Sequence, residues 1–343
     1  MTQITKTCDK AHSRRGFKWL QEARESEAAC MSHTRAIPQL PGIAGSGSRN
    51  RLNSFRTSLQ IAFRHILFAT DFSTTADRAL PYAVEIARRS FATIHAVHVI
   101  SPDVYPQLPP AEWAEIAHDQ EEFRARKKNE LELELRELPH EFLLLKGDVW
   151  ESLKEVIENR NVDLLVLGTH GRTGIAKVLM GSVAEKIFRQ APCPVLTVGP
   201  GVASIAGHAA AAELNCILYA TDFSPESLAA ARYAISLAKD HRAELTLLHT
   251  TEDGIKGEED LSLETLKNVV PLGAGLLSKP TYVMEHGAPA VAILGAAKKT
   301  HADLIVIGAR GVERHLTAAT HFSDSIASSV AANAGCPVLT VHS

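Results

Sequence analysis

The sequence contains little of what marks a membrane protein, a metalloprotein or a disulfide-linked secreted domain. Its 343 residues include five cysteines, and no two of them form a CxxC pair, so neither a zinc ribbon nor a dithiol redox motif is predicted. No apolar run approaches the roughly 20 residues that a membrane-spanning helix needs. The N-terminus lacks the apolar core of a secretory signal. We therefore expect reduced thiols, no membrane partner and a cytoplasmic location.

Three common signatures of ligand and catalytic sites are also missing. The sequence has no GxxxxGK[ST] phosphate loop, no GxGxxG after its first predicted strand and no GxSxG nucleophile elbow. The formal net charge of −3 gives no field that would attract nucleic acid. These absences disfavour a P-loop NTPase, a classical dinucleotide-binding protein, a nucleophile-elbow hydrolase and a nucleic-acid partner.

What the sequence does contain is a duplicated unit. HILFATDFS at 65–73 returns as CILYATDFS at 216–224, VDLLVLG at 162–168 returns as ADLIVIG at 302–308, and APCPVLTV at 191–198 returns as AGCPVLTV at 334–341. A period of this length indicates a duplicated domain and not a solenoid.

Four segments follow from the repeats and the composition. Residues 1–60 carry ten Lys and Arg against four Asp and Glu, with little helical periodicity, which predicts a disordered basic extension. The first copy is predicted at 62–200 and the second at 214–343, with a linker of small residues at 201–213. An arm that touches nucleic acid or anionic lipid is the weaker interpretation of the extension.

Within each copy, short apolar runs alternate with amphipathic segments, which predicts an α/β fold with a doubly wound parallel sheet. Strands are expected at 65–70, 93–99, 141–146, 163–168 and 194–198, and again at 215–220, 244–249, 280–285, 303–308 and 337–341. Helices of the first copy are expected at 75–90, 112–137, 149–160 and 181–190. The long charged helix at 112–137 is expected to pack on the sheet, and binding of a partner is the alternative.

The stretch most indicative of function is GTHGRTGIAKVLMGS at 168–182. It follows the fourth predicted strand and precedes a helix. In that setting Gly168, Gly171 and Gly181 let backbone N–H groups approach a phosphate without a Cβ in the way. Ser182 either donates its hydroxyl to the phosphate or caps the helix.

Ligands of doubly wound sheets bind beyond the carboxyl ends of the strands, and three further residues are expected there. Asp71 follows the first strand, either as an acceptor for a ribose hydroxyl or an adenine amine or as a turn carboxylate. Val99 ends the second strand, where its backbone could meet an adenine edge. Arg172 lies on the glycine loop and faces either phosphate or solvent. No histidine is grouped with carboxylates in a metal-ligand spacing, so no metal site is predicted.

Together these motifs resemble the universal stress protein family in its tandem two-domain form. The resemblance covers about residues 63–343 and is carried by ATDFS, DLLVLGTHGRTG, the G-x2-G-x9-G-S spacing and the terminal CPVLTV. It implies a five-stranded parallel sheet of order 3-2-1-4-5 in each copy. It also implies bound ATP or AMP, with or without Mg²⁺. By position, the nucleotide contacts it implies are Asp71, Val99, Gly168, Gly171, Gly181 and Ser182.

The second copy departs from this pattern. Its loop GARGVERHLTAATHFSDS keeps the two leading glycines, but Asp324 and Ser325 occupy the places of Gly181 and Ser182. A carboxylate about 4 Å from a phosphate costs about 4 kcal/mol at an effective dielectric near 20. We therefore expect the second copy to bind ATP weakly or not at all, with Asp222 and Ser325 retained for structure.

The sequence thus predicts a stress-response regulator that binds ATP or AMP in its first domain, with no catalytic residue assigned. A slow nucleotide hydrolase, autophosphorylation at Ser182 and a nucleotide-free scaffold stay open as alternatives. The resemblance also implies that Pro194–Val198 and Pro337–Val341 pair within one chain as a pseudo-dimer, which would protect exposed strand edges. Further homo-oligomerisation and an unknown protein partner stay open as well.

Overall fold

The computed structural model describes residues 61–101, 110–169, 181–205, 212–251, 258–309 and 325–342. All of them belong to one compact unit, Ser54–Ser343. The predicted disordered extension at 1–60 lies outside the described residues, and so do Gly171 and Arg172 of the predicted site.

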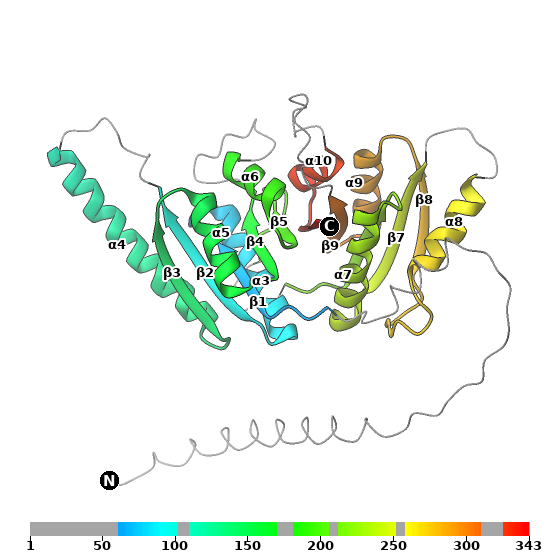
Figure 1. The fold of residues 1–343 in the computed structure, drawn as a ribbon, viewed down its shortest axis with the longest axis horizontal. Coiled ribbons are helices and arrows are strands. Elements are labelled where there is room, and N and C mark those ends of the chain that lie inside the picture. Colours follow the sequence, from blue (N-terminus) through cyan, green and yellow to red (C-terminus); the bar gives the residue numbers. More distant parts are fainter. Residues whose placement is uncertain are drawn as a thin grey trace, which may run out of the picture. The chain divides into compact units, whose positions relative to one another are not determined.

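Strands and helices alternate in the first half in the predicted order (Figure 1). The described elements are β1 (His65–Ala69), α3 (Thr74–Ser90), β2 (Thr93–Ile100), α4 (Pro110–Leu135), β3 (His140–Lys146), α5 (Val149–Arg160), β4 (Leu164–Gly168), α6 (Ser182–Gln190) and β5 (Val195–Val198).

The second half repeats this alternation. Its described elements are β6 (Cys216–Thr221), α7 (Pro225–His241), β7 (Glu244–Thr251), α8 (Glu258–Val269), β8 (Thr281–His286), α9 (Pro289–Lys299), β9 (Leu304–Ala309), α10 (Ile326–Asn333) and β10 (Val338–His342). Every predicted strand is present. They could be predicted because strands that are buried on both faces have almost continuous apolar sequences.

The described strands form one sheet in the order β3-β2-β1-β4-β5-β10-β9-β6-β7-β8. Within each half the paired strands are parallel. Both halves therefore have the order 3-2-1-4-5 that the resemblance implied, and the predicted α/β fold class is confirmed.

The two halves meet where β5 and β10 pair in antiparallel orientation, with Leu196 opposite Leu339. Two buried hydroxyls add to this pairing. Thr197 Oγ1 donates to the carbonyl oxygen of Val338 at 3.2 Å, and Thr340 Oγ1 donates to that of Val195 at 3.1 Å. The inner edge of each half is thereby covered by the other half.

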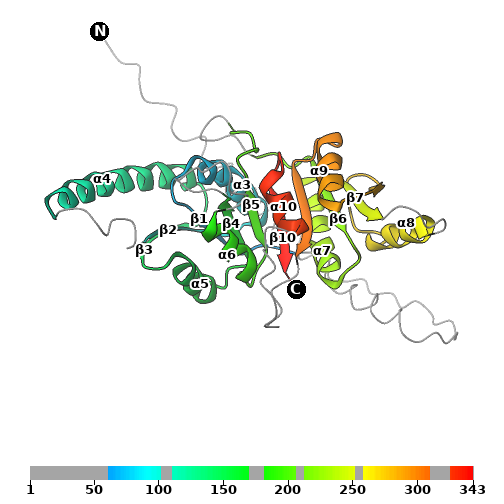
Figure 2. The same cartoon turned by 90° about the horizontal axis from the view of Figure 1, so that it is seen from above.

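Helices cover both faces of the sheet. Side chains of α3, α4, α7 and α8 share one hydrophobic core with alternate strand residues such as Val166 and Leu339. Side chains of α5, α6, α9 and α10 share the opposite core with residues such as Leu165 and Val338. Figure 2 shows α4 and α5 on opposite sides of β1, β2 and β3.

The same carboxylate contact fixes the first strand of each half. Asp163 accepts hydrogen bonds from the backbone nitrogens of Arg64 and His65, at 2.7 and 3.1 Å. Asp303 accepts from the two backbone nitrogens at the start of β6, at 2.8 and 2.9 Å. The aspartate of the repeated apolar motif VDLLVLG/ADLIVIG therefore ties the fourth strand of each copy to its first strand.

The long helix α4 packs on the sheet through its C-terminal half, as expected. Leu131 and Leu135 are buried in the core beneath it, whereas its outer surface carries ion pairs such as Lys127–Glu130 at 3.0 Å. The side chains of residues 110–118 lie outside the description. Across the part of the chain described here, no helix has the combination of length and hydropathy needed to span a bilayer.

Candidate functional site

A cleft opens at the carboxyl ends of β1, β2 and β4, which is the edge where doubly wound sheets bind ligands. Its volume is about 260 Å³. Four of the predicted site residues line it, namely Asp71, Val99, Gly168 and Gly181. The apolar side chains that line it include Val97, Val149, Leu153, Leu167, Val183, Ala184 and Ile187. Ser182 begins α6 beside Gly181, whereas Gly171 and Arg172 are not among the described residues.

The turn after β1 is held by its own hydrogen bonds. Thr70 Oγ1 accepts from the backbone nitrogen of Phe72 at 2.9 Å, and Asp71 Oδ1 accepts from that of Ser73 at 2.9 Å. Ser73 Oγ in turn accepts from the backbone nitrogen of Ala76 at 3.3 Å and caps α3. Phe72 has a left-handed φ of 59°. Hydroxyl and carboxylate side chains at these positions are what such a turn and helix start require.

The second copy builds the same turn. Asp222 Oδ1 accepts from the backbone nitrogen of Ser224 at 3.0 Å, and Phe223 has a φ of 61°. Turn geometry therefore accounts for the ATDFS motif in both copies. For Asp71 the sequence left a ligand role and a turn role open. The structure establishes the turn role, and Asp71 also borders the cleft.

A histidine of the second strand supports each turn, a role that the sequence analysis missed. His98 Nδ1 donates to the carbonyl oxygen of Thr70 at 2.8 Å, and its ring lies 4.5 Å from that of Phe72. His249 does the same in the second copy at 2.7 Å. The signal was present in the sequence, because both histidines occupy the same place in the repeat. No cluster of His, Cys, Asp and Glu that could hold a metal occurs in the described ranges.

Gly168 and Gly181 are glycines for different physical reasons. A Cβ on Gly168 would lie 2.8 Å from the carbonyl carbon of Thr75 and 2.9 Å from the nitrogen of Ala76, so glycine lets β4 touch the start of α3. Gly181 has φ −64° and ψ 148°, which any residue adopts. Among the described residues, a Cβ there would meet only the carbonyl oxygen of Thr169, at 3.4 Å. Neither the backbone conformation nor packing against the described residues therefore demands glycine at 181.

The helices that begin at the two clefts have different N-caps. Gly181 precedes α6 and provides no side-chain hydrogen bond. In the second copy Ser325 precedes α10, and its Oγ accepts from the backbone nitrogen of Ser328 at 3.1 Å. An N-terminal N–H that meets no capping side chain can serve an anion, and the helix dipole favours negative charge there.

The second cleft occupies the equivalent place in the second copy but has a volume of only about 100 Å³. Two equivalent positions of the repeat carry larger side chains in the second cleft. Leu248 stands where the first copy has Val97, and Ile326 stands where it has Val183. Each of these side chains is larger by one methylene, which contributes to the smaller volume of the second cleft.

The sequence matches the universal stress protein family in two segments, residues 62–199 and 214–342. The chain belongs to the universal stress protein family. It is 31% identical over 150 residues to a universal stress protein of Methanocaldococcus jannaschii, covering 43% of this chain and 88% of that protein. It is 36% identical over 148 residues to universal stress protein A homolog 1 of Coxiella burnetii, covering 40% of this chain and 96% of that protein.

Among solved structures, a universal stress protein from Archaeoglobus fulgidus matches with a TM-score of 0.61 at 22% identity, over 81% of this chain and 98% of that one. This likeness shows a shared fold. The tandem two-domain form that the repeats and motifs indicated is confirmed by the two matched segments.

Proposed function

We propose that this universal stress protein binds ATP or AMP in its first domain and acts as a stress-response regulator, without efficient catalysis. One observation carries the proposal, namely the contrast between the two equivalent clefts. The first cleft has a volume of about 260 Å³, and the helix that begins beside it, α6, has no capping side chain. The second cleft has a volume of about 100 Å³, and the helix that begins beside it, α10, is capped by Ser325.

The adenosine part would lie over the ends of β1 and β2. The backbone nitrogen of Thr70 donates to the carbonyl oxygen of Val97 at 2.9 Å. Backbone groups of successive strand residues point to alternate sides, so the N–H and C=O of Val99 point to the same side as those of Val97, toward β1. Because β1 ends at Ala69, it does not reach Val99. An adenine edge can therefore meet this backbone. Asp71 can accept a hydrogen bond from a ribose hydroxyl in addition to the one from the backbone nitrogen of Ser73, since a carboxylate has about four acceptor sites.

The phosphates would lie at the start of α6, against the backbone of Gly181 and Ser182. The helix dipole and the N–H groups of the first turn both favour negative charge there. The loop that carries Gly171 and Arg172 is proposed to complete this site. Asp71 is the acidic residue among the described lining residues, so Mg²⁺ would be held mainly by phosphate oxygens.

We propose further that the two domains act as an intrachain pseudo-dimer. The antiparallel pairing of β5 with β10 supports this arrangement. The cytoplasmic location and any higher oligomer stay predictions.

Gly181→Asp is the sharpest test of the nucleotide site. Its backbone conformation accepts any residue, and aspartate is a preferred N-cap, so the variant should unfold at the same temperature or a higher one. Its carboxylate would nevertheless repel the phosphates. We expect isothermal titration calorimetry to give one nucleotide per wild-type chain and none for the variant.

Ser325→Ala is the matched control in the second domain and should still bind one nucleotide. Unchanged binding by Gly181→Asp, or two nucleotides per wild-type chain, would overturn the proposal. Indifference of the wild-type chain to ATP and AMP at millimolar concentration would favour the scaffold alternative. Multiple turnovers of ATP would favour the hydrolase.

A further inference from the structure

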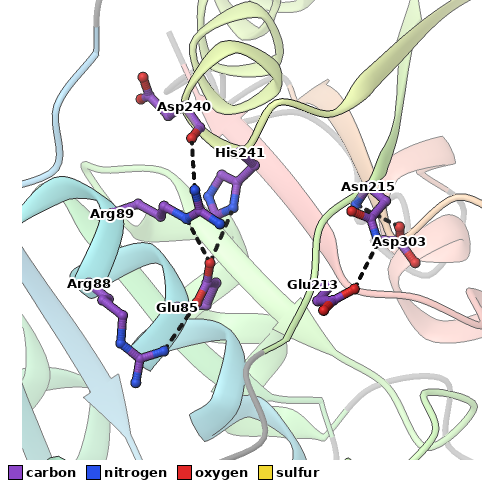
Figure 3. Close-up of polar contacts among 8 residues, drawn as sticks. All are labelled: Glu85, Arg88, Arg89, Glu213, Asn215, Asp240, His241 and Asp303. Carbon is purple, nitrogen blue, oxygen red and sulfur yellow. Dashed lines mark hydrogen bonds and ion pairs between the residues drawn. The ribbon is translucent and has the colours of Figure 1, made fainter. Parts of the chain in front are cut away.

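The two domains also meet away from the strand pairing, where the C-terminal ends of α3 and α7 lie side by side (Figure 3). Glu85 of α3 is buried there, with a relative exposure of 4%. Its carboxylate pairs with Arg88 at 3.3 Å and with Arg89 at 2.9 Å. Arg89 also donates to the backbone carbonyl of Asp240 in α7, at 3.5 Å. We call this region the α3–α7 contact.

His241, the last residue of α7, points into this contact (Figure 3). Its side chain is 2% exposed, and its Nδ1 lies 3.7 Å from Glu85 Oε1. This distance is too long for a hydrogen bond. Among the described residues Nδ1 has no hydrogen-bond partner. An unsatisfied polar atom buried between two domains is uncommon and calls for a reason.

The equivalent positions of the other domain do not repeat this arrangement in the described part of the chain, although the domains are copies. In the repeat alignment Glu85 corresponds to Ser236, and His241 corresponds to Ser90. Ser236 instead exchanges hydrogen bonds with the backbone of Ile61, at 3.1 and 2.9 Å. The carboxylate and the imidazole therefore come from positions that do not correspond, and they meet only because the two domains face each other.

Charge and burial decide the protonation state of His241. The titratable groups on the segments that meet here are Glu85, Arg88 and Arg89 of α3, Lys239, Asp240 and Arg242 at the end of α7, and the exposed Arg64 before β1. The pKa of His241 is lowered from 6.5 to about 4, mainly by burial; Glu85 acts against this shift, and Arg89 adds to it. The ring is therefore neutral in the closed contact at neutral pH.

We propose that the α3–α7 contact between the domains is sensitive to pH, and that protonation of His241 separates α7 of the second domain from α3 of the first. Glu85 compensates the new charge only in part, because its carboxylate also pairs with Arg88 and Arg89 and because Arg89 repels the imidazolium. The inference concerns the opposite end of α3 from the nucleotide cleft and does not depend on the proposed function.

The direction and size of the effect follow from linkage. A histidine with a folded-state pKa of about 4 and an exposed value of 6.5 binds its proton preferentially when the contact is open. The closed contact is therefore fully stable above pH 6.5 and weakens as the pH falls toward 4. At pH 5 the opening equilibrium should be about 30-fold larger than at pH 7.5.

Hydrogen exchange of the full chain tests this proposal. After correction for intrinsic exchange rates, amides of residues 236–243 should lose about tenfold or more of their protection between pH 7.5 and pH 5. The β5–β10 amides should not change. His241→Gln, a neutral variant, should show no such loss. His301→Asn is the control, because His301 is exposed and has a φ of 51° that asparagine accepts.

Two further variants keep the proposal falsifiable if His241→Gln does not fold. Arg89→Gln removes a repulsive charge and should weaken the pH response, whereas Glu85→Gln removes an attractive one and should strengthen it. The same loss of protection in His241→Gln as in the wild type, or a His241 ring that titrates near 6.5 by NMR, would overturn the proposal. So would responses of equal sign in the Arg89 and Glu85 variants.

Discussion

A β-carbon on Gly168 would lie 2.9 Å from the backbone nitrogen of Ala76, so β4 and the first turn of α3 touch at a point where only glycine fits. Gly168→Ala must push the helix away from the sheet, and overpacking of this kind costs about 1–3 kcal/mol. Urea unfolding should show this loss. Gly181→Ala is the matched control and should cost less than about 1 kcal/mol, since a Cβ there would not clash with any described residue. Equal losses in the two variants would contradict the packing argument.

The N-cap of α10 gives a second prediction. Ser325→Ala removes the acceptor for the backbone nitrogen of Ser328 and should lower the free energy of unfolding by about 1 kcal/mol. Ser329→Ala, one turn further along the same helix, should be neutral or slightly stabilising because alanine favours helices. Thermal unfolding of both variants checks the difference, and a larger loss for Ser329→Ala would refute the cap.

The buried hydroxyls between β5 and β10 give a third testable prediction. Thr340→Val keeps the shape of the side chain but removes its hydrogen bond to Val195. The expected loss is about 1 kcal/mol of unfolding free energy, and Thr197→Val should lose a similar amount. Denaturant titration measures both, and no loss in either variant would mean that these hydroxyls do not strengthen the joint.

The buried thiols give a prediction that depends on pH. Burial raises the pKa of Cys193 and of Cys336 to about 12. Both thiols are therefore neutral from pH 7 to pH 10, and the thiolate is the reactive form. In a chain with Cys8→Ser and Cys30→Ser, Ellman's reagent should leave these two thiols unmodified until urea unfolds the protein. Rapid labelling of either thiol in the native state at pH 8 would contradict this assignment.

The sequence was sufficient to predict the architecture. Strands such as Leu164–Gly168 are apolar along their whole length because helices cover both faces of the sheet. Because the unit is duplicated, each strand could also be predicted a second time from the other copy. The order of the strands came only from the family resemblance, since apolar periodicity does not say which strands are neighbours.

The site was harder to predict because the same residues serve the turn and border the cleft. Asp71 bonds Ser73 and also lines the cleft, and no single sequence separates these two roles. The cap of α10 differs by one residue from the repeat alignment, since the structure uses Ser325 where the aligned cap position is Asp324. Such a shift depends on where the helix begins and not on the motif.

The contact between Glu85 and His241 was beyond sequence reasoning altogether. The two residues occupy positions of the repeat that do not correspond, and only the packing of α3 against α7 brings them together. Neither residue lies in a motif, and a buried glutamate is recognised only once its neighbours are known.

Among the described strands, the pairing of β5 with β10 leaves two different strands at the borders of the sheet, β3 on one side and β8 on the other. A dimer built from two identical halves would carry the same border strand twice, so one self-complementary contact between molecules would repeat at both ends and grow a fibre. In this chain a contact between β3 and the β3 of a second copy stops after one pair. Covalent fusion of two unlike halves thus caps polymer growth by this route.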